Sequence, residues 1–174
     1  QEICNGMFFK SMEELLPIIE REGIRFSGTP GASYQDTSFV FQVWASARRA
    51  AILPKGYLHY RVDNANSSVK SSSKVFAVCD EYELSREFLA KDPEKQRAFG
   101  KIVNLLKLGT YRWNFNRLTD ESRRAFAERM REEYLRAREE GTLDRDMFAP
   151  ADWEMLNLMR DDFDAFMARF ESGM

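Results

Sequence analysis

The chain has 174 residues, of which 44% are hydrophobic and 13% aromatic, which supports a packed domain and excludes an intrinsically disordered chain. Its 26 Lys and Arg residues nearly balance its 28 Asp and Glu residues, so the net charge of −2 excludes a strongly basic nucleic-acid-binding protein. No apolar run approaches the roughly 20 residues of a transmembrane helix, so we expect no membrane-spanning segment. Because the first residue is Gln1 and not Met, we expect that the chain is a piece of a longer protein.

The first 73 residues predict a small unit of helices and short strands. A helix over residues 8–22 contains the disruptive Pro17 and ends at Gly23. Short apolar runs predict three strands, at residues 24–26, 51–53 and 57–62. A second helix is expected over residues 36–50, and its predicted buried stripe consists of Phe39, Val40, Val43, Trp44 and Ala47.

From residue 74 the pattern is almost continuously helical. Asp92 and Thr119 are predicted N-caps, Gly141 is a predicted helix end, and Pro150 begins the last helix. Because each helix is too short to be stable alone, the apolar faces must pack on one another. The predicted fold class is mainly α, of the α+β type, with a mixed α/β unit over residues 1–73 and an antiparallel helical layer over residues 74–174.

The first candidate site is the segment from Gly28 to Phe39, a loop of small residues that leads into a helix. Asp36 stands where the free N–H groups of that helix favour a carboxylate. A loop of small residues also lets a substrate approach closely. The alternative is an N-cap aspartate with no further role.

The second candidate site lies between Leu58 and Val69. In a strand, His59 and Arg61 point to the same face. With the Asn- and Ser-rich loop that follows, they could bind an anionic group such as a diphosphate. The alternative is a solvated strand edge.

Two further features have simple structural explanations. Tyr111, Arg112 and Trp113 could form a carbohydrate-stacking patch, but helix packing with an exposed arginine also explains them. Cys79 lies on an apolar stripe and is expected to be a small buried side chain, not a nucleophile.

Four segments, in this order, resemble the C-terminal half of bacterial family-2 glycosyltransferases, the kind involved in surface polysaccharide or lipopolysaccharide synthesis. The segments are residues 23–26 (GIRF), 29–39 (TPGASYQDTSF), 58–69 (LHYRVDNANSSV) and 74–82 (KVFAVCDEY). The resemblance covers residues 1 to about 90, and the helical tail more loosely.

The resemblance implies a GT-A fold, a Rossmann-like α/β sheet that binds a nucleotide-sugar, and sugar transfer with inversion. It implies Asp36 as the catalytic base, although Gln35 stands where relatives often carry Glu. It places His59 and Arg61 near the donor diphosphate or metal. The loop residues that it places at the acceptor are Thr29, Ser33, Tyr34 and Gln35.

The nucleotide-binding half of the family, with its Asp-x-Asp metal motif, does not appear in this sequence. A divalent metal, Mn²⁺ or Mg²⁺, is therefore expected in the full-length enzyme. No cofactor is expected in this chain, and no metal ligand beyond His59. The residues Asp162-Phe163-Asp164 have the letters of the motif, but they lie in the last predicted helix and are not expected to bind metal.

We therefore expect the acceptor-side portion of an inverting glycosyltransferase, inactive alone. Its partners would be a nucleotide-sugar and a glycan acceptor, reached through the missing half, and no nucleic acid. We expect a cytoplasmic protein that can act at the inner face of the membrane. The alternative is a non-enzymatic helical module for interaction or homo-oligomer formation.

Overall fold

The computed structural model describes residues 12–28, 34–49 and 74–171, and helices account for 81% of them. The helices in chain order are α1 (Met12–Glu22), α2 (Gln35–Ser46), α3 (Ala77–Ala90), α4 (Pro93–Arg117), α5 (Asp120–Glu139), the short 3-10 helix η3 (Arg145–Met147), α6 (Pro150–Asp161) and α7 (Phe163–Glu171). None of these helices is long and apolar enough to cross a membrane.

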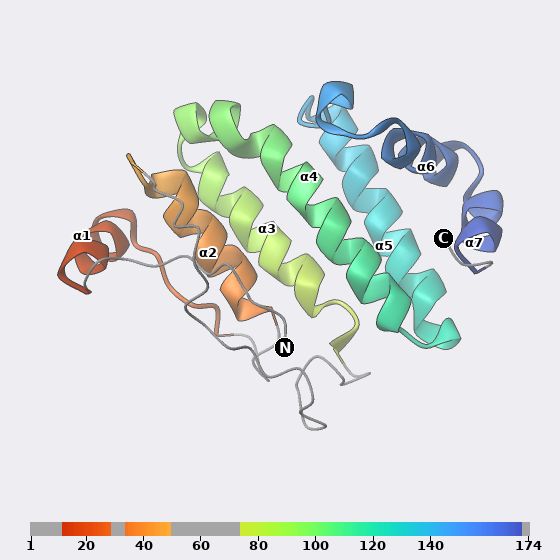
Figure 1. Ribbon diagram of the computed structural model, residues 1–174, viewed down its shortest axis with the longest axis horizontal. Helices are drawn as coiled ribbons and strands as arrows, with labels where there is room; N and C mark the ends of the chain where they lie inside the picture. The colour runs from red at the N-terminus through yellow and green to blue at the C-terminus, as the bar shows by residue number, and fades with distance from the viewer. Residues whose placement is uncertain (1–11, 29–33, 50–73, 172–174) are drawn as a thin grey trace, which may run out of the picture.

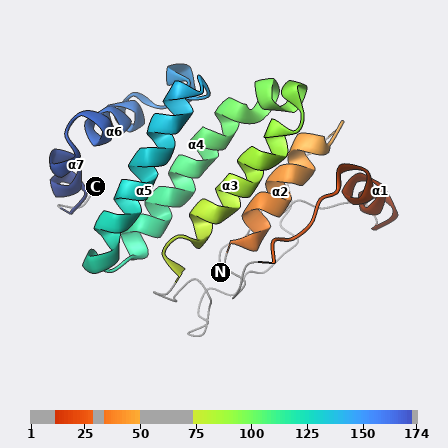
Figure 2. The same ribbon diagram turned by 180° about the vertical axis from the view of Figure 1, so that it is seen from behind.

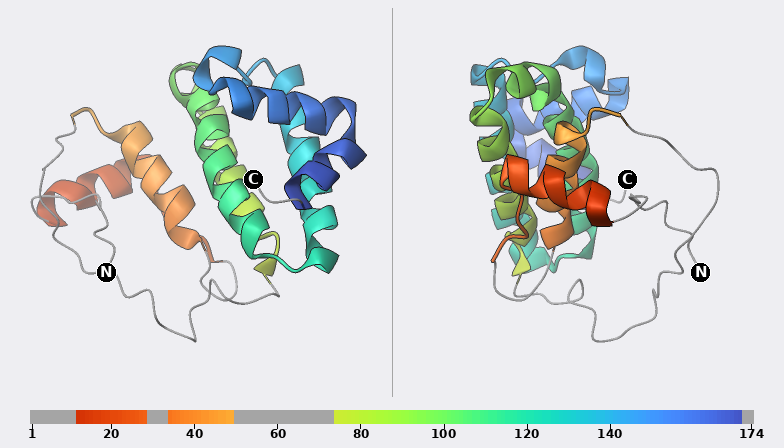
Figure 3. Two further views of the ribbon diagram at one scale, coloured as in Figure 1. Left: turned by 45° about the vertical axis from the view of Figure 1, so that its right-hand side comes forward. Right: turned by 90° about the vertical axis from the view of Figure 1, so that its left-hand side faces the viewer.

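Helices α2 to α5 lie side by side in one layer (Figures 1 and 2). Short turns join α3 to α4 and α4 to α5, so these neighbours run in opposite directions. Helix α1 lies beside α2 at one end of the layer, and α6 and α7 lie at the other end, where α6 contacts α5 (Figure 3). The first turns of α2 and α3 and the last turn of α4 meet at one edge of this layer.

The core is built from aromatic and aliphatic side chains of the layer and of the helices at its far end. The Tyr111 ring of α4 lies 5.2 Å from the Phe126 ring of α5 and 5.7 Å from the Tyr82 ring of α3. The predicted inner face of α5 is confirmed, because its apolar residues at helical spacing are all buried: Phe126, Met130, Tyr134 and Ala137.

The predicted helix ends are confirmed where local chemistry specifies them. The Asp92 side chain accepts hydrogen bonds from the backbone N–H groups of Glu94 (3.0 Å) and Lys95 (3.2 Å) at the start of α4. Gly141 adopts a φ of 68° after α5, a conformation that costs glycine least. Thr119 occupies the N-cap position of α5, but its side chain makes no capping hydrogen bond.

The predicted mixed α/β unit, and with it the GT-A-like sheet that the resemblance implies, is wrong, because the described residues contain no strand. The mainly α part of the prediction agrees with the structure. Residues 24–26, which were expected to form a strand, instead follow the C-terminal end of helix α1. Gly23 is in the left-handed conformation, with a φ of 64°, and the N–H of Ile24 bonds back to the carbonyl of Ile19 (3.0 Å), closing the end of α1. Ile24 is then fully buried against the helical core. The strands expected at 51–53 and 57–62 lie outside the described residues.

Two other helical predictions need correction. The predicted stripe of helix α2 is confirmed only in part, because Val43 is fully buried whereas Trp44 is 42% exposed. The buried residues of this helix are Ser38, Phe41, Gln42, Val43, Ala45 and Ser46. The last predicted helix is two helices, because Asp162 leaves the helical conformation and its carboxylate accepts a hydrogen bond from the N–H of Ala165 (2.9 Å) at the start of α7.

Candidate functional site

Asp36 lies in the first turn of α2 and its side chain is exposed. The residue before this helix is Tyr34, in the left-handed conformation with a φ of 62°, so Asp36 is inside the helix and not at its N-cap. The free N–H groups of the first turn and the positive end of the helix dipole lie at this end of the helix. The exposed carboxylate is therefore available to a group arriving from solvent.

Tyr34 is fixed by the last turn of α4. Its hydroxyl donates to Oδ1 of Asn114 (2.9 Å) and accepts from Nε of Arg117 (3.0 Å). The Arg117 guanidinium also lies 5.6 Å from the centre of the Tyr34 ring. Burial raises the pKa of Tyr34, and the neighbouring Arg117 charge opposes that rise. The unusual backbone conformation before α2 is thus held by polar contacts from α4.

Asn114 is fully buried and links three parts of the chain. Its Oδ1 accepts hydrogen bonds from Tyr34 and from Nε of Arg117 (2.9 Å), while its Nδ2 donates to the carbonyl of Val75 (3.1 Å). Val75 stands just before α3. The side chain of Asn114 therefore connects the residue that precedes α2, a residue that precedes α3, and the last turn of α4.

A second buried polar residue, Glu81 of α3, lies at the same edge of the layer. It has no exposed surface, and its two carboxylate oxygens accept hydrogen bonds from the hydroxyls of Ser27 and Ser38, one on each side of the 29–33 segment. The Ser85 hydroxyl donates to the backbone carbonyl of Glu81 (3.1 Å). Both ends of the predicted acceptor loop are therefore joined to α3.

The Tyr111–Trp113 segment divides between core and surface. Tyr111 is fully buried, Arg112 pairs with Asp152, and Trp113 is 50% exposed. The Trp113 ring meets the ring of Tyr34 edge-on at 6.1 Å, and Tyr34 stands two residues before Asp36 in the chain. The Arg117 guanidinium lies 5.6 Å from the centre of the Trp113 ring. Only Trp113 of the predicted patch could stack on a ligand.

Of the other predicted site residues, Gln35 is half-buried in the first turn of α2. The remaining four lie outside the described residues, so their proximity to Asp36 stays a prediction: Thr29, Ser33, His59 and Arg61. Within residues 12–28, 34–49 and 74–171, no group of three or more His, Cys, Asp or Glu side chains could hold a metal ion. Asp162 caps α7, and Asp164 pairs with Arg124 (3.0 Å).

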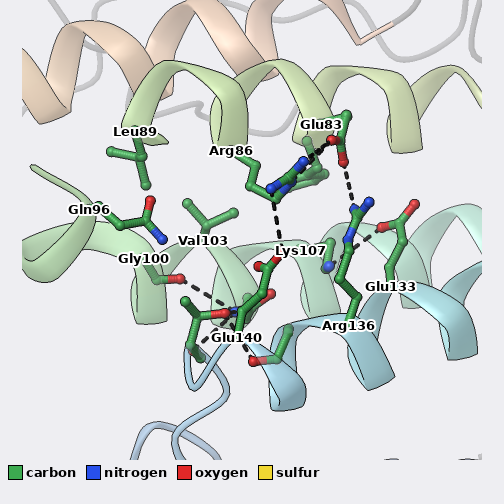
Figure 4. Close-up of a pocket in the computed structure, with 14 residues that line it drawn as sticks. Glu83, Arg86, Leu89, Gln96, Gly100, Val103, Lys107, Glu133, Arg136 and Glu140 are labelled. Atoms are coloured by element: carbon green, nitrogen blue, oxygen red, sulfur yellow. Dashed lines mark hydrogen bonds and ion pairs between the residues drawn. The ribbon is translucent and has the colours of Figure 1, made fainter. Parts of the chain in front are cut away.

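A charged pocket lies between α3, α4 and α5 (Figure 4), but its groups already bind one another. Glu83 accepts from both Arg86 and Arg136 at 2.6 Å, and Lys107 lies 3.4 Å from Glu133. The pocket has a volume of about 20 Å³, which is room for one water molecule and not for a sugar. These charges join the three helices and do not form a substrate site.

Sequence reasoning missed Glu81 and Asn114. Each lies on a buried stripe at helical spacing: Glu81 is three residues after Val78 and four before Ser85, and Asn114 is three after Tyr111. A carboxylate or amide on an otherwise apolar stripe must be hydrogen-bonded inside the protein. That is the signal that could have identified both residues.

Comparison of the chain with protein-family models, curated proteins and solved structures gives no match.

Proposed function

We propose that this chain is the acceptor-side part of an inverting glycosyltransferase in which Asp36 is the general base. The observation that supports this function is the exposed position of the Asp36 carboxylate in the first turn of α2. A buried or inward-facing carboxylate would have ruled the role out. The resemblance of residues 29–39 and 58–69 to family-2 glycosyltransferases supplies the reaction class.

Asp36 would accept the proton of the acceptor hydroxyl as that oxygen attacks the anomeric carbon of the donor sugar. The bond from the anomeric carbon to the diphosphate oxygen then breaks, and the electron pair leaves with the diphosphate. The transition state has oxocarbenium character, as in glycoside hydrolysis. The divalent metal that the resemblance implies would be held by the other half of the full-length enzyme, where it would stabilise the charge of the leaving diphosphate.

The surroundings of Asp36 support an acceptor role for this edge of the layer. Trp113 offers a half-exposed indole beside Tyr34, and an aromatic face of this kind suits the C–H face of a sugar ring. His59 and Arg61 would act on the leaving diphosphate, as the resemblance implies. Helices α3 and α4 support the segment that carries Asp36.

The test is Asp36→Asn in the full-length enzyme that contains this chain. Removal of a general base should lower kcat by about 10²–10⁴-fold, while calorimetry should show unchanged binding of the nucleotide-sugar. The matched control is Asp120→Asn, because Asp120 is another exposed aspartate in the first turn of a helix. Transfer at a near-normal rate by Asp36→Asn would remove this residue from the mechanism.

A second candidate function is a helical interaction module. It is favoured by the mainly α structure and by large apolar side chains left exposed on the described surface, namely Leu16, Phe26, Trp44, Phe76, Leu106 and Trp113. Light scattering that shows a dimer or larger assembly at micromolar concentration would support this function. A strict monomer would count against it.

A further inference from the structure

We propose that Glu81 and Asn114 are positioning residues that hold Asp36 in place by clamping the ends of the acceptor loop; this inference rests on the proposed function. The two residues are on different helices of the layer, and both are fully buried. Neither touches the exposed carboxylate of Asp36. They act on the backbone that carries it.

Glu81 holds the loop from both sides. Ser27 precedes the 29–33 segment and Ser38 follows it, and each donates a hydroxyl to a different oxygen of the same carboxylate. Ser38 lies two residues after Asp36 in α2. A shift of the first turn of α2 would therefore break a hydrogen bond inside the core, where a lost partner is not replaced by water.

Asn114 fixes the residue from which α2 starts. Its Oδ1 accepts from the hydroxyl of Tyr34, whose left-handed backbone directs the chain into α2. A left-handed conformation at a non-glycine residue persists only where its surroundings hold it. Asp36 is thus enclosed between two anchored positions, Tyr34 and Ser38.

Asn114 also anchors the chain before α3. Its Nδ2 donates to the carbonyl of Val75, two residues before Ala77, where α3 begins. The same side chain therefore holds the residue that precedes α2 and a residue that precedes α3, the helix that carries Glu81.

The first experiment measures hydrogen–deuterium exchange on the full 174-residue chain and needs no activity. Glu81→Ala should speed exchange in peptides covering residues 27–38 by about tenfold or more, as expected for loss of a hydrogen bond to a charged group. Exchange in α4 and α5 should stay unchanged. Glu81→Gln keeps an oxygen and an N–H for the two serines, so it should restore most of the protection.

The matched control is Glu133→Ala. Glu133 is also a buried glutamate, 4% exposed, but its partners are Tyr111 (2.6 Å), Arg129 (2.7 Å) and Lys107 (3.4 Å), away from the loop. It should leave exchange at residues 27–38 as in the unsubstituted chain. Ser38→Ala removes only one hydroxyl and provides the same test if Glu81→Ala does not fold. Unchanged exchange at residues 27–38, or equal acceleration throughout the chain, would overturn the proposal.

The second experiment measures transfer by the full-length enzyme. Ser38→Ala and Asn114→Ala should lower kcat while the Kd of the nucleotide-sugar stays constant, because the base is misplaced and the donor site is not. If Asp36→Asn retains activity but Glu81→Ala still frees residues 27–38, the proposed function fails and the clamp stands. If Asp36→Asn is inactive but exchange at residues 27–38 does not change, the clamp fails alone.

Discussion

Cys79 shows how the helical layer controls the chemistry of a single side chain. It lies on α3 with 1% of its surface exposed, and its expected role as a buried apolar residue is confirmed. Burial, with a smaller contribution from the negative charge of Glu133, raises the pKa of the Cys79 thiol from an ordinary value of 9.0 to about 12. Only the thiolate is a good nucleophile, so this thiol should be inert at neutral pH.

The prediction for Cys79 is a very slow reaction with a thiol reagent such as DTNB. Below pH 9 the thiolate fraction is about a thousandfold lower than that of a free cysteine with a pKa of 9.0. The experiment uses a Cys4→Ser variant, so that Cys79 is the one remaining thiol. Guanidinium should restore rapid labelling, because unfolding exposes the sulfur. Rapid labelling of the folded variant at pH 8 would contradict the burial of Cys79.

Among the helices, the break between α6 and α7 depends on one carboxylate. Asp162 has extended backbone angles, and its side chain accepts from the N–H of Ala165, so α7 begins with its own cap. The break lets Phe166 and Met167 of α7 reach the core. One straight helix over the same residues would carry those side chains in another direction.

Asp162→Ala should therefore lower the free energy of unfolding by about 1 kcal/mol, the usual cost of a lost N-cap, and lower the Tm by about 2–4 °C. Differential scanning calorimetry measures the Tm, and hydrogen exchange should accelerate in α7 before α5. Asp161→Ala is the control, because Asp161 is an exposed neighbour that pairs with Arg160 on the surface. Equal effects of the two substitutions would show that the cap does not stabilise α7.

The sequence analysis was most accurate for helices whose ends contain residues with a strong local preference for a helix boundary. Asp92, Gly141 and Pro150 mark helix boundaries through local hydrogen bonding and backbone preference, which act without a tertiary partner. The buried face of α5 followed from its spacing, since its opposite face is charged. These are local properties, and a single sequence displays them.

Other features depend on tertiary contacts that spacing does not reveal. Helix α2 buries Ser38, whose hydroxyl donates to Glu81 of α3, whereas the more apolar Trp44 of the same helix is 42% exposed. Residues 24–26 have strand-like composition, but the end of α1 uses the N–H of Ile24 and the helical core takes its side chain. Asp36 was placed correctly at a helix start, whereas the hydrogen bonds that hold this end of the helix come from residues 43 to 83 positions further along the chain.

At the scale of the whole molecule, the helical layer buries several tyrosines and one cysteine whose pKa values are raised by burial. Burial raises the pKa of Tyr82 from 10.0 to about 12, and it also raises the pKa values of Tyr111 and Tyr134. Cys79 behaves in the same way. Burial lowers the pKa of Lys107, whose amine lies 4.6 Å from the centre of the Tyr134 ring. The effect of Lys107 on how stability changes with pH is therefore opposite to that of the tyrosines and Cys79.

The fold should therefore lose stability as the pH rises above about 9. The unfolded chain releases the Cys79 proton near 9.0 and the tyrosine protons near 10.0, whereas the folded chain retains them. Each such group lowers the free energy of unfolding by up to about 1.4 kcal/mol per pH unit above its unfolded pKa. Urea titrations at pH 8 and pH 11 measure the loss, and Tyr82→Phe should reduce its slope above pH 10. Equal stability at the two pH values would contradict the burial of these groups.

The contacts of Asn114 with Tyr34 and Val75 have a consequence for the connectivity of the chain. The polypeptide departs from Tyr34, forms α2, and returns at Val75 to the same amide, so 40 residues make a closed excursion whose ends meet. Backbone scission or an inserted sequence between residues 50 and 73, after α2 and before α3, should leave these hydrogen bonds intact. Two fragments divided there would each keep one side of the α2–α3 interface, so we expect them to reassociate in a fragment-complementation experiment.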